Sequence, residues 1–164
     1  MNNPFSPVLE QVTNNTTSWI GKRSADNETL VTGQTFVSPS AGDLEAIEIF
    51  PNVVTQPGKL TMTLHNIDQH QGWGPALKTA EVDIKNSESG KWLSFGLNGL
   101  HLDKGRQYGF KLASNDAYVG IGEAAGTSAK PSLQTGQEWH FTKNHSSNEC
   151  FSYFSLAFKV DMRA

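Results

Sequence analysis

Cysteine is nearly absent from this sequence: Cys150 is the only one among 164 residues. A single thiol cannot form a disulfide within the chain, and it cannot supply the cysteine set that most structural zinc sites use. Its neighbours Glu149 and Phe151 carry no positive charge that would activate the thiol. We therefore expect Cys150 to be a buried, unreactive side chain.

An excess of either charge is also missing. The chain has 13 Lys and Arg against 16 Asp and Glu, for a net charge of −3, and these residues are scattered singly. No basic stripe could follow a nucleic-acid backbone, and no polybasic run could bind an anionic membrane. No apolar run is long enough to span a bilayer. We expect neither nucleic acid as a partner nor membrane insertion.

The N-terminus, Met1–Phe5, lacks the basic and apolar regions of a signal peptide. The chain is therefore either intracellular or one module of a longer exported protein. Its 164 residues suit one domain. A domain of this size buries roughly 70% of its unfolded surface, so it needs no disulfide or metal to fold. We expect residues 1–18 to be a polar lead-in segment and residues 19–164 to form one domain.

Long helical periodicity is absent, and period-two alternation of apolar and polar residues takes its place. The segment Leu60–His65 shows this clearly, with Leu60, Met62 and Leu64 on one face. The same alternation returns at 108–112 and 156–162, and shorter strands are expected at 35–37, 45–50, 81–84, 92–95, 118–121 and 139–142. The only helix that the pattern allows is a turn around residues 124–125, which is too short to organise the fold.

Glycine- and proline-rich turns separate these runs at residues 40–43, 56–58, 87–90 and 103–105. Many short strands with one apolar face each predict an all-β fold, a two-sheet antiparallel β-sandwich of the jelly-roll type. The predicted core consists of Leu60, Met62, Leu64, Trp92, Tyr108, Phe110, Leu112, Leu156, Phe158 and Val160.

The connection from His65 to Pro75 is the most unusual stretch for function. Trp73 lies between Gly72 and Gly74, an arrangement that could leave the indole face open to a flat ligand such as a sugar ring. The alternative is that Trp73 folds back and covers one end of the sandwich. Around it, side chains that could hydrogen-bond to sugar hydroxyls are His65, Asp68, His70 and Gln71. These five residues are the predicted ligand site.

The same stretch makes a poor metal site, because its two histidines are five residues apart and share no face of a strand or helix. We therefore predict no metal ligands and no cofactor, although calcium bound near Asp43 and Glu45 stays open. If Trp139 faces inward, Glu138 and His140 on either side of it form an outward pair, which is more often a solvated contact than an acid–base dyad. The sequence does not assign Trp19 or Trp139 to core or surface.

Enzyme signatures do not hold. Residues 120–126 look like a dinucleotide-binding fingerprint but have one residue too many and no βαβ context. No Gly-x-Ser-x-Gly elbow is present. The pair Glu81 and Asp83 lies two residues apart on a face expected to be exposed. We expect a non-catalytic protein, with a glycosidase built from carboxylates distant in sequence as the remaining catalytic option.

The order of strands and turns from residue 33 to residue 162 forms a recognisable series. Its parts are residues 33–39, 42–47, 60–64, 74–77, 92–95, 102–112 and 156–160. This order resembles accessory jelly-roll domains of bacterial surface and secreted proteins, which are similar in shape to carbohydrate-binding modules. The resemblance implies a binding role and a place at the cell surface or outside the cell within a larger protein, and it assigns no site residue.

These observations favour a non-catalytic module that binds a polysaccharide or glycan. The alternative is a structural or adhesive spacer domain whose loops serve folding or contacts with a protein partner.

Overall fold

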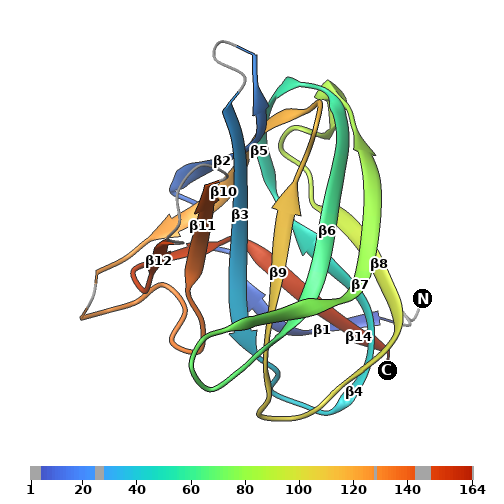
Figure 1. Ribbon diagram of the computed structural model, residues 1–164, viewed down its shortest axis with the longest axis vertical. Coiled ribbons are helices and arrows are strands. Elements are labelled where there is room, and N and C mark those ends of the chain that lie inside the picture. Colours follow the sequence, from blue (N-terminus) through green and yellow to red (C-terminus); the bar gives the residue numbers. More distant parts are fainter. Residues whose placement is uncertain (1–4, 25–27, 128, 143–148, 164) are drawn as a thin grey trace.

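The chain forms two antiparallel β-sheets in the computed structural model, which describes residues 5–24, 28–127, 129–142 and 149–163 (Figure 1). The smaller sheet contains, in spatial order, β1 (Phe5–Gln11), β14 (Phe158–Arg163), β4 (Gly42–Ile49) and β8 (Leu93–Leu102). The larger sheet contains β13 (Phe154–Leu156), β10 (Tyr118–Ala125), β2 (Thr16–Arg23), β3 (Glu28–Val37), β9 (Gln107–Ala113), β6 (Gly58–Ile67) and β7 (Trp73–Ile84).

Three further strands extend the larger sheet: β5 (Pro51–Gln56) pairs with β10, and β11 (Glu138–Thr142) pairs with β3 and with β12 (Glu149–Phe151). The described strand pairs are antiparallel, so the predicted two-sheet β-sandwich is confirmed. The chain passes repeatedly from one sheet to the other, as in a jelly roll. The only helical segment assigned in the described residues is a short 3₁₀ turn, Asn86–Glu88, and no helix there could cross a bilayer.

The N-terminal segment takes part in both sheets. β1 pairs with β14 in the smaller sheet, with a register shift between Pro7 and Leu9. β2 begins at Thr16 and pairs with β10 in the larger sheet. The strand pairing therefore runs through the position where the sequence suggested a boundary between lead-in and domain.

The core lies between the sheets and is built by period-two alternation, as the sequence predicted. The predicted core residues are buried, with the exception of Trp92. Phe158 shows how the two sheets meet, because its ring contacts Phe36 and Phe110 of the larger sheet at centroid distances of 6.0 and 5.6 Å. A one-residue slip of β14 would turn this whole set of side chains outward.

Trp92 is half-buried and lies outside the core, contrary to prediction. β8 begins one residue later, and its inward face carries Leu93, Phe95 and Leu97. Alternation therefore places Trp92 on the opposite face, where the Lys159 Nζ lies 4.3 Å from its ring centroid.

Two other local predictions are wrong. Cys150 is exposed, because it lies on the short strand β12, which pairs with β11 alone among the described strands. Ala124 and Ala125 are not helical. They end strand β10 and pair with Ser155 and Phe154 of β13, so long-range pairing overrides the helical preference of alanine.

Candidate functional site

The predicted binding loop is mostly part of a β-hairpin. β6 continues to Ile67 and β7 begins at Trp73, so only residues 68–72 form the connection, and Ile67 pairs with Trp73. Gln71 adopts a positive φ of 63°, which a non-glycine residue rarely does. The long open loop expected from the sequence is therefore a tight turn on a paired ribbon.

Asp68 is committed to this turn. Its Oδ1 accepts hydrogen bonds from the backbone amides of His70, at 2.8 Å, and Gly72, at 2.7 Å. The same two amides hold the pKa of the Asp68 carboxyl below its usual value. His70 is exposed at the tip of the turn. The structure therefore gives Asp68 a turn-forming role and leaves His70 in solvent.

His65 is buried and fully hydrogen-bonded. Its Nδ1 donates to the Gly74 carbonyl at 2.7 Å, and its Nε2 therefore accepts from the Thr63 hydroxyl at 2.8 Å. Burial lowers the pKa of His65, so the ring is neutral at physiological pH. Its edge meets the Trp73 ring at a centroid distance of 5.4 Å. His65 thus positions Trp73 on the sheet.

Trp73 is the centre of an aromatic group, here called the Trp73 cluster, which consists of Trp73, Trp139, Phe141 and Lys111. The Trp139 and Phe141 rings meet Trp73 edge to face, at centroid distances of 6.0 and 5.3 Å. The Lys111 Nζ lies 4.3 Å from the Phe141 ring centroid. Trp73 Cη2 lies so close to Gly109 that a Cβ there would be 2.6 Å away. Trp73 is therefore half-buried and packed against the sheet.

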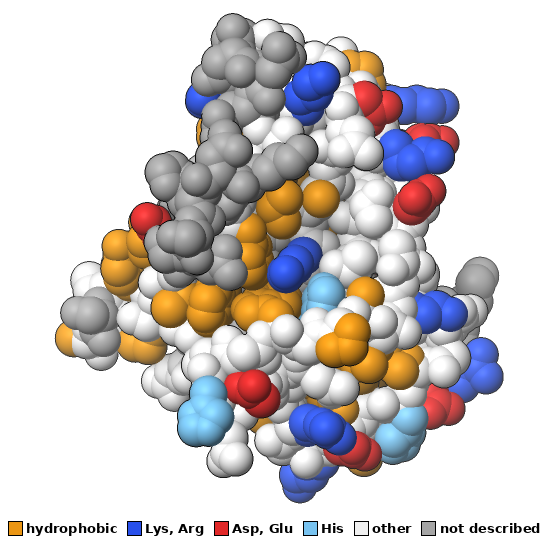
Figure 2. Space-filling model, viewed as in Figure 1, with side chains coloured by type: hydrophobic (Ala, Val, Ile, Leu, Met, Phe, Trp, Pro, Cys, Tyr) orange, Lys and Arg blue, Asp and Glu red, His pale blue; other side chains and the backbone are white. Residues whose placement is uncertain are grey.

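Figure 2 shows this outer face of the larger sheet, with hydrophobic side chains gathered around a lysine. Beside the Trp73 cluster, the Gln71 side chain exchanges hydrogen bonds with Gln107, at 3.1 Å in both directions, and accepts one from Gln137 at 3.2 Å. The hairpin turn is thereby tied to β9 and to the segment that precedes β11. Of the five predicted site residues, His65 and Trp73 contact each other, whereas the Gln71 side chain bonds to the amides of Gln107 and Gln137 instead.

A deeper site lies where the larger sheet splits. β2 and β3 pair with each other only between Gly21–Arg23 and Glu28–Leu30. Beyond this short ladder the two strands separate: among the described strands, the rest of β2 pairs only with β10, and β3 pairs with β11 on that side. A cavity of about 460 Å³ fills this split; we call it the wedge pocket. The residues that line it include Thr17, Trp19, Thr32, Glu123, His140, Phe141 and Glu149.

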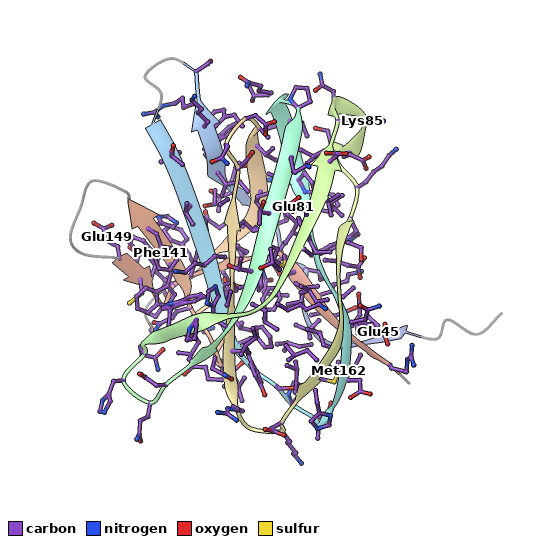
Figure 3. All side chains as sticks on the ribbon, turned by 45° about the vertical axis from the view of Figure 1, so that its right-hand side comes forward. Glu45, Glu81, Lys85, Phe141, Glu149 and Met162 are labelled. Carbon is purple, nitrogen blue, oxygen red and sulfur yellow. The ribbon has the colours of Figure 1, made fainter. Side chains whose placement is uncertain are left out.

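Aromatic rings flank the wedge pocket. Trp19 is 37% exposed, and one face of its indole stacks on Tyr118 at a centroid distance of 4.9 Å with an interplanar angle of 17°. Phe141 comes from β11, and Figure 3 shows it close to Glu149 at the same end of the molecule. Trp19 therefore belongs to the surface, a question that the sequence left open.

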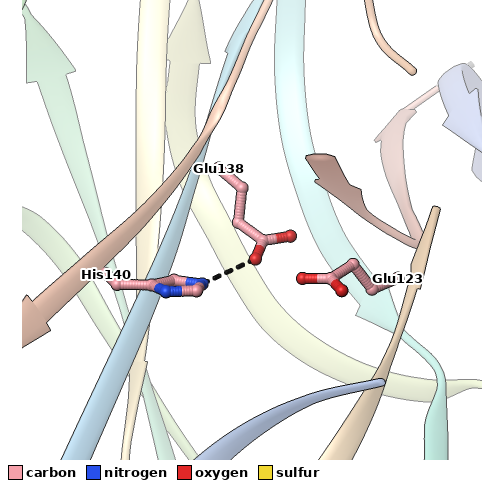
Figure 4. Close-up of side chains that lie close together, drawn as sticks. All are labelled: Glu123, Glu138 and His140. Carbon is pink, nitrogen blue, oxygen red and sulfur yellow. Dashed lines mark hydrogen bonds and ion pairs between the residues drawn. The ribbon is translucent and has the colours of Figure 1, made fainter. Parts of the chain in front are cut away.

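Carboxyl groups and an imidazole lie at the floor of the pocket. Glu138 is fully buried, and its Oε2 lies 2.7 Å from His140 Nε2. Glu123, on β10, faces them (Figure 4). One ligand atom from each of the three residues lies within 4.8 Å of the other two. The prediction of an outward, solvated Glu138–His140 pair is wrong, because β11 has side chains packed on both of its faces.

Burial dominates the electrostatics of this acidic cluster, which we define as Glu123, Glu138 and His140. Burial, followed by the neighbouring Glu138 carboxyl, raises the pKa of Glu123 to about 9. Burial also raises the pKa of Glu138, and it lowers the pKa of His140. The two carboxyls therefore cannot both ionise easily without a compensating cation.

Little in the local sequence pattern indicates this cluster. Glu123 lies some fifteen residues before Glu138, in the connection beyond the expected end of β10, and only strand pairing brings the two together.

Near the possible calcium position, the carboxylates already have protein partners: Glu45 accepts from Arg163 at 2.8 Å, and Asp43 lies 3.1 Å from His101 Nδ1.

No protein-family model matches this chain, and no curated protein matches its sequence. Solved structures do share its fold. One contains the cysteine protease and lectin-like domains of Cwp84, a surface layer associated protein of Clostridium difficile, with a TM-score of 0.53 and 10% identity over 84% of this chain and 33% of that one. Another is the clostridial protease Cwp84 after propeptide cleavage, with a TM-score of 0.51 and 11% identity over 82% of this chain and 36% of that one. This chain thus spans about a third of the length of those proteins, and the likeness concerns the fold.

Proposed function

We propose that this domain is a non-catalytic module that binds carbohydrate, with the sugar stacked on Trp19 at the mouth of the wedge pocket. The observation that carries the proposal is the combination of an exposed indole, supported from behind by Tyr118, with a largely apolar cavity of about 460 Å³ beside it that also contains hydroxyl and carboxyl groups. Aromatic faces pack against the C–H patches of sugar rings, and buried polar groups fix their hydroxyls.

The polar groups of the pocket suit hydroxyl ligands. Thr17 and Thr32 offer hydroxyls, which donate and accept. Glu123, with its raised pKa, holds a proton at neutral pH and can donate a hydrogen bond as well as accept one. The lectin-like domain within one structural neighbour supports the same class of ligand. Together these features favour a neutral saccharide.

A glycosidase that uses the Glu123–Glu138 pair fits this pocket poorly. Such enzymes place a glycosidic bond between two carboxyl groups that both reach the substrate. Glu138 has no exposed surface and does not line the pocket, whereas Glu123 and His140 do. A sugar in the pocket could therefore touch Glu123 and Glu149 but not Glu138, so the close Glu123–Glu138 pair cannot flank a glycosidic bond.

The Trp73 hairpin is the second position that we propose for a sugar, as the sequence suggested, with Gln71 and His70 at its edge. Its weakness is that Trp73 is packed against Gly109 and its ring neighbours, whereas Trp19 exposes more than a third of its surface. The wedge pocket is therefore the preferred site.

The test begins with native affinity gels containing xylan, β-glucan or mannan, and continues with calorimetry on whichever polysaccharide retards the protein. We expect Trp19→Ala to weaken binding about tenfold, because one stacking contact contributes on the order of 1.4 kcal/mol. Leu77→Ala is the matched control, since Leu77 is 38% exposed and lies on β7.

Trp73→Ala distinguishes the two positions. A loss confined to Trp73→Ala would move the site to the hairpin. Unchanged affinity in folded Trp19→Ala and folded Trp73→Ala would reject both positions, and no retardation by any polysaccharide would favour a structural or adhesive spacer domain.

A further inference from the structure

The acidic cluster contains an unsatisfied group. Glu138 is fully buried, its Oε2 is bonded to His140, and its Oε1 makes no hydrogen bond of good geometry among the described residues, although the Glu123 carboxyl and the Ser18 hydroxyl are its polar neighbours. Figure 4 shows that this carboxyl points between the His140 ring and the Glu123 carboxyl. A buried carboxylate oxygen without a partner is costly, so the cluster is incomplete as it stands.

Two kinds of partner could complete it: a proton shared between the carboxyls, or a metal cation. The surroundings favour a cation. None of the described side chains that line the wedge pocket is a lysine or an arginine, and a third carboxylate, Glu149, lines it as well. Glu138 and the described lining of the pocket therefore place three acidic groups near His140, with no lysine or arginine among the lining residues.

The geometry suits a small divalent ion. In a tetrahedral site with bonds of about 2.1 Å, the ligand atoms are about 3.4 Å apart. The three candidate ligand atoms lie within 4.8 Å of one another, and the His140–Glu138 pair is at 2.7 Å. Small rotations of Glu123 and His140 would bring all three to bonding distance, with the hydrogen bond between His140 and Glu138 giving way to two metal bonds.

We propose that Glu123, Glu138 and His140 form a binding site for a divalent transition-metal ion, of which zinc is the representative. An imidazole combined with carboxylates favours such ions over calcium and magnesium, which prefer all-oxygen ligand sets. Glu123 and His140 line the wedge pocket, whereas Glu138 lies beneath them. The fourth coordination position therefore faces the pocket, where water or another ligand can occupy it.

This inference does not depend on carbohydrate binding, and its test contains no saccharide. Protein freed of metal by dialysis against a chelator is titrated with zinc chloride in a calorimeter, and cobalt chloride is used separately for visible absorption spectra. We expect one equivalent of zinc to bind, the thermal midpoint to rise with zinc, and cobalt to give the absorption bands of a low-coordinate site.

Glu138→Gln and His140→Asn each remove one ligand while preserving size, and each should weaken zinc binding by about tenfold or more. Glu138→Gln relieves the burial of a carboxyl, so the metal-free variant should be at least as stable as the wild type. Glu123→Gln provides a third ligand variant should either of the others fail to fold.

Two matched controls address other groups of this chain that could bind zinc. His101→Asn removes the exposed histidine that lies beside Asp43 and Asp103, and Cys150→Ser removes the exposed thiol. Both should bind zinc as the wild type does. The proposal is overturned if the wild type binds no stoichiometric zinc, which would indicate a proton-sharing carboxyl pair. It is equally overturned if zinc affinity survives in the folded ligand variants or is lost in a control.

Discussion

Replacing Gly109 with alanine tests whether Trp73 is packed against the sheet. A Cβ at Gly109 would lie 2.6 and 2.7 Å from Trp73 Cη2 and Cζ3, closer than non-bonded carbons approach. The Trp73 ring cannot move away freely, because Trp139 and Phe141 meet it edge to face. Overpacking of this kind costs about 1 to 3 kcal/mol, and the rigid surroundings place it near the upper end.

The same substitution should be harmless once the indole is shortened. Trp73→Phe keeps an aromatic ring but removes Cη2 and Cζ3, the two atoms nearest the new Cβ, and leaves Ile67 Cδ1 at 3.0 Å as its next contact. Alanine is favoured over glycine in a strand by roughly 0.5 to 1 kcal/mol, and the end of the Ile67 side chain can move aside, so Gly109→Ala should then be close to neutral. The coupling energy between positions 73 and 109 should therefore be about 2 to 3 kcal/mol.

Urea unfolding followed by far-ultraviolet circular dichroism measures this double-mutant cycle without relying on tryptophan fluorescence. Gly96→Ala is the matched control, since Gly96 also lies in a strand and a Cβ there meets nothing within 4 Å. It should change stability equally in both backgrounds. Additive effects of the substitutions at 73 and 109 would refute the packing described for Trp73.

Two further outcomes concern stability. Phe158→Ala should lower the free energy of unfolding by about 3 to 5 kcal/mol, because it removes a fully buried ring between Phe36 and Phe110; an unchanged urea midpoint would contradict the core assignment. Burial, together with neighbouring Glu48, raises the pKa of Asp161 from 3.8 to about 7, so the folded state keeps a proton that the unfolded state loses. The free energy of unfolding should therefore fall as pH rises from about 4 to about 7. Asp161→Asn should be more stable than the wild type by about 1 to 2 kcal/mol at pH 8 and equal to it near pH 3. Equal stability of the two proteins at both pH values would contradict this.

The sandwich was predictable because one-face burial leaves a period-two trace in the sequence. The inward set Leu60, Met62 and Leu64 alternates with Thr61 and Thr63; the leucines and the methionine are buried, and the threonines are partly exposed. The same rule explains the error at Trp92, where the alternation was started one residue early. The buried face of a strand can therefore be predicted from the sequence wherever the opposite face of that strand meets solvent.

The candidate sites were less predictable because they depend on which strands pair. The flanking glycines Gly72 and Gly74 make Trp73 the predicted ligand residue, yet the glycine that determines how its ring packs is Gly109, on β9. Glu123 and Glu138 meet only because β2 leaves β3 and β11 replaces it. Nothing in the local pattern of either segment specifies that exchange of partners.

Strand β11 shows why the two candidate sites are physically linked. Its side chains alternate, so Trp139 and Phe141 join the Trp73 cluster on one face while Glu138 and His140 form the acidic cluster on the other. A register slip of one residue would exchange the two sets, placing an indole among the carboxyls and two polar groups against Trp73. The pairing of Trp139 with Gly33 on β3 sets this register. Because Phe141 also lines the wedge pocket, the aromatic packing on the outer face fixes the position of the ligands beneath it.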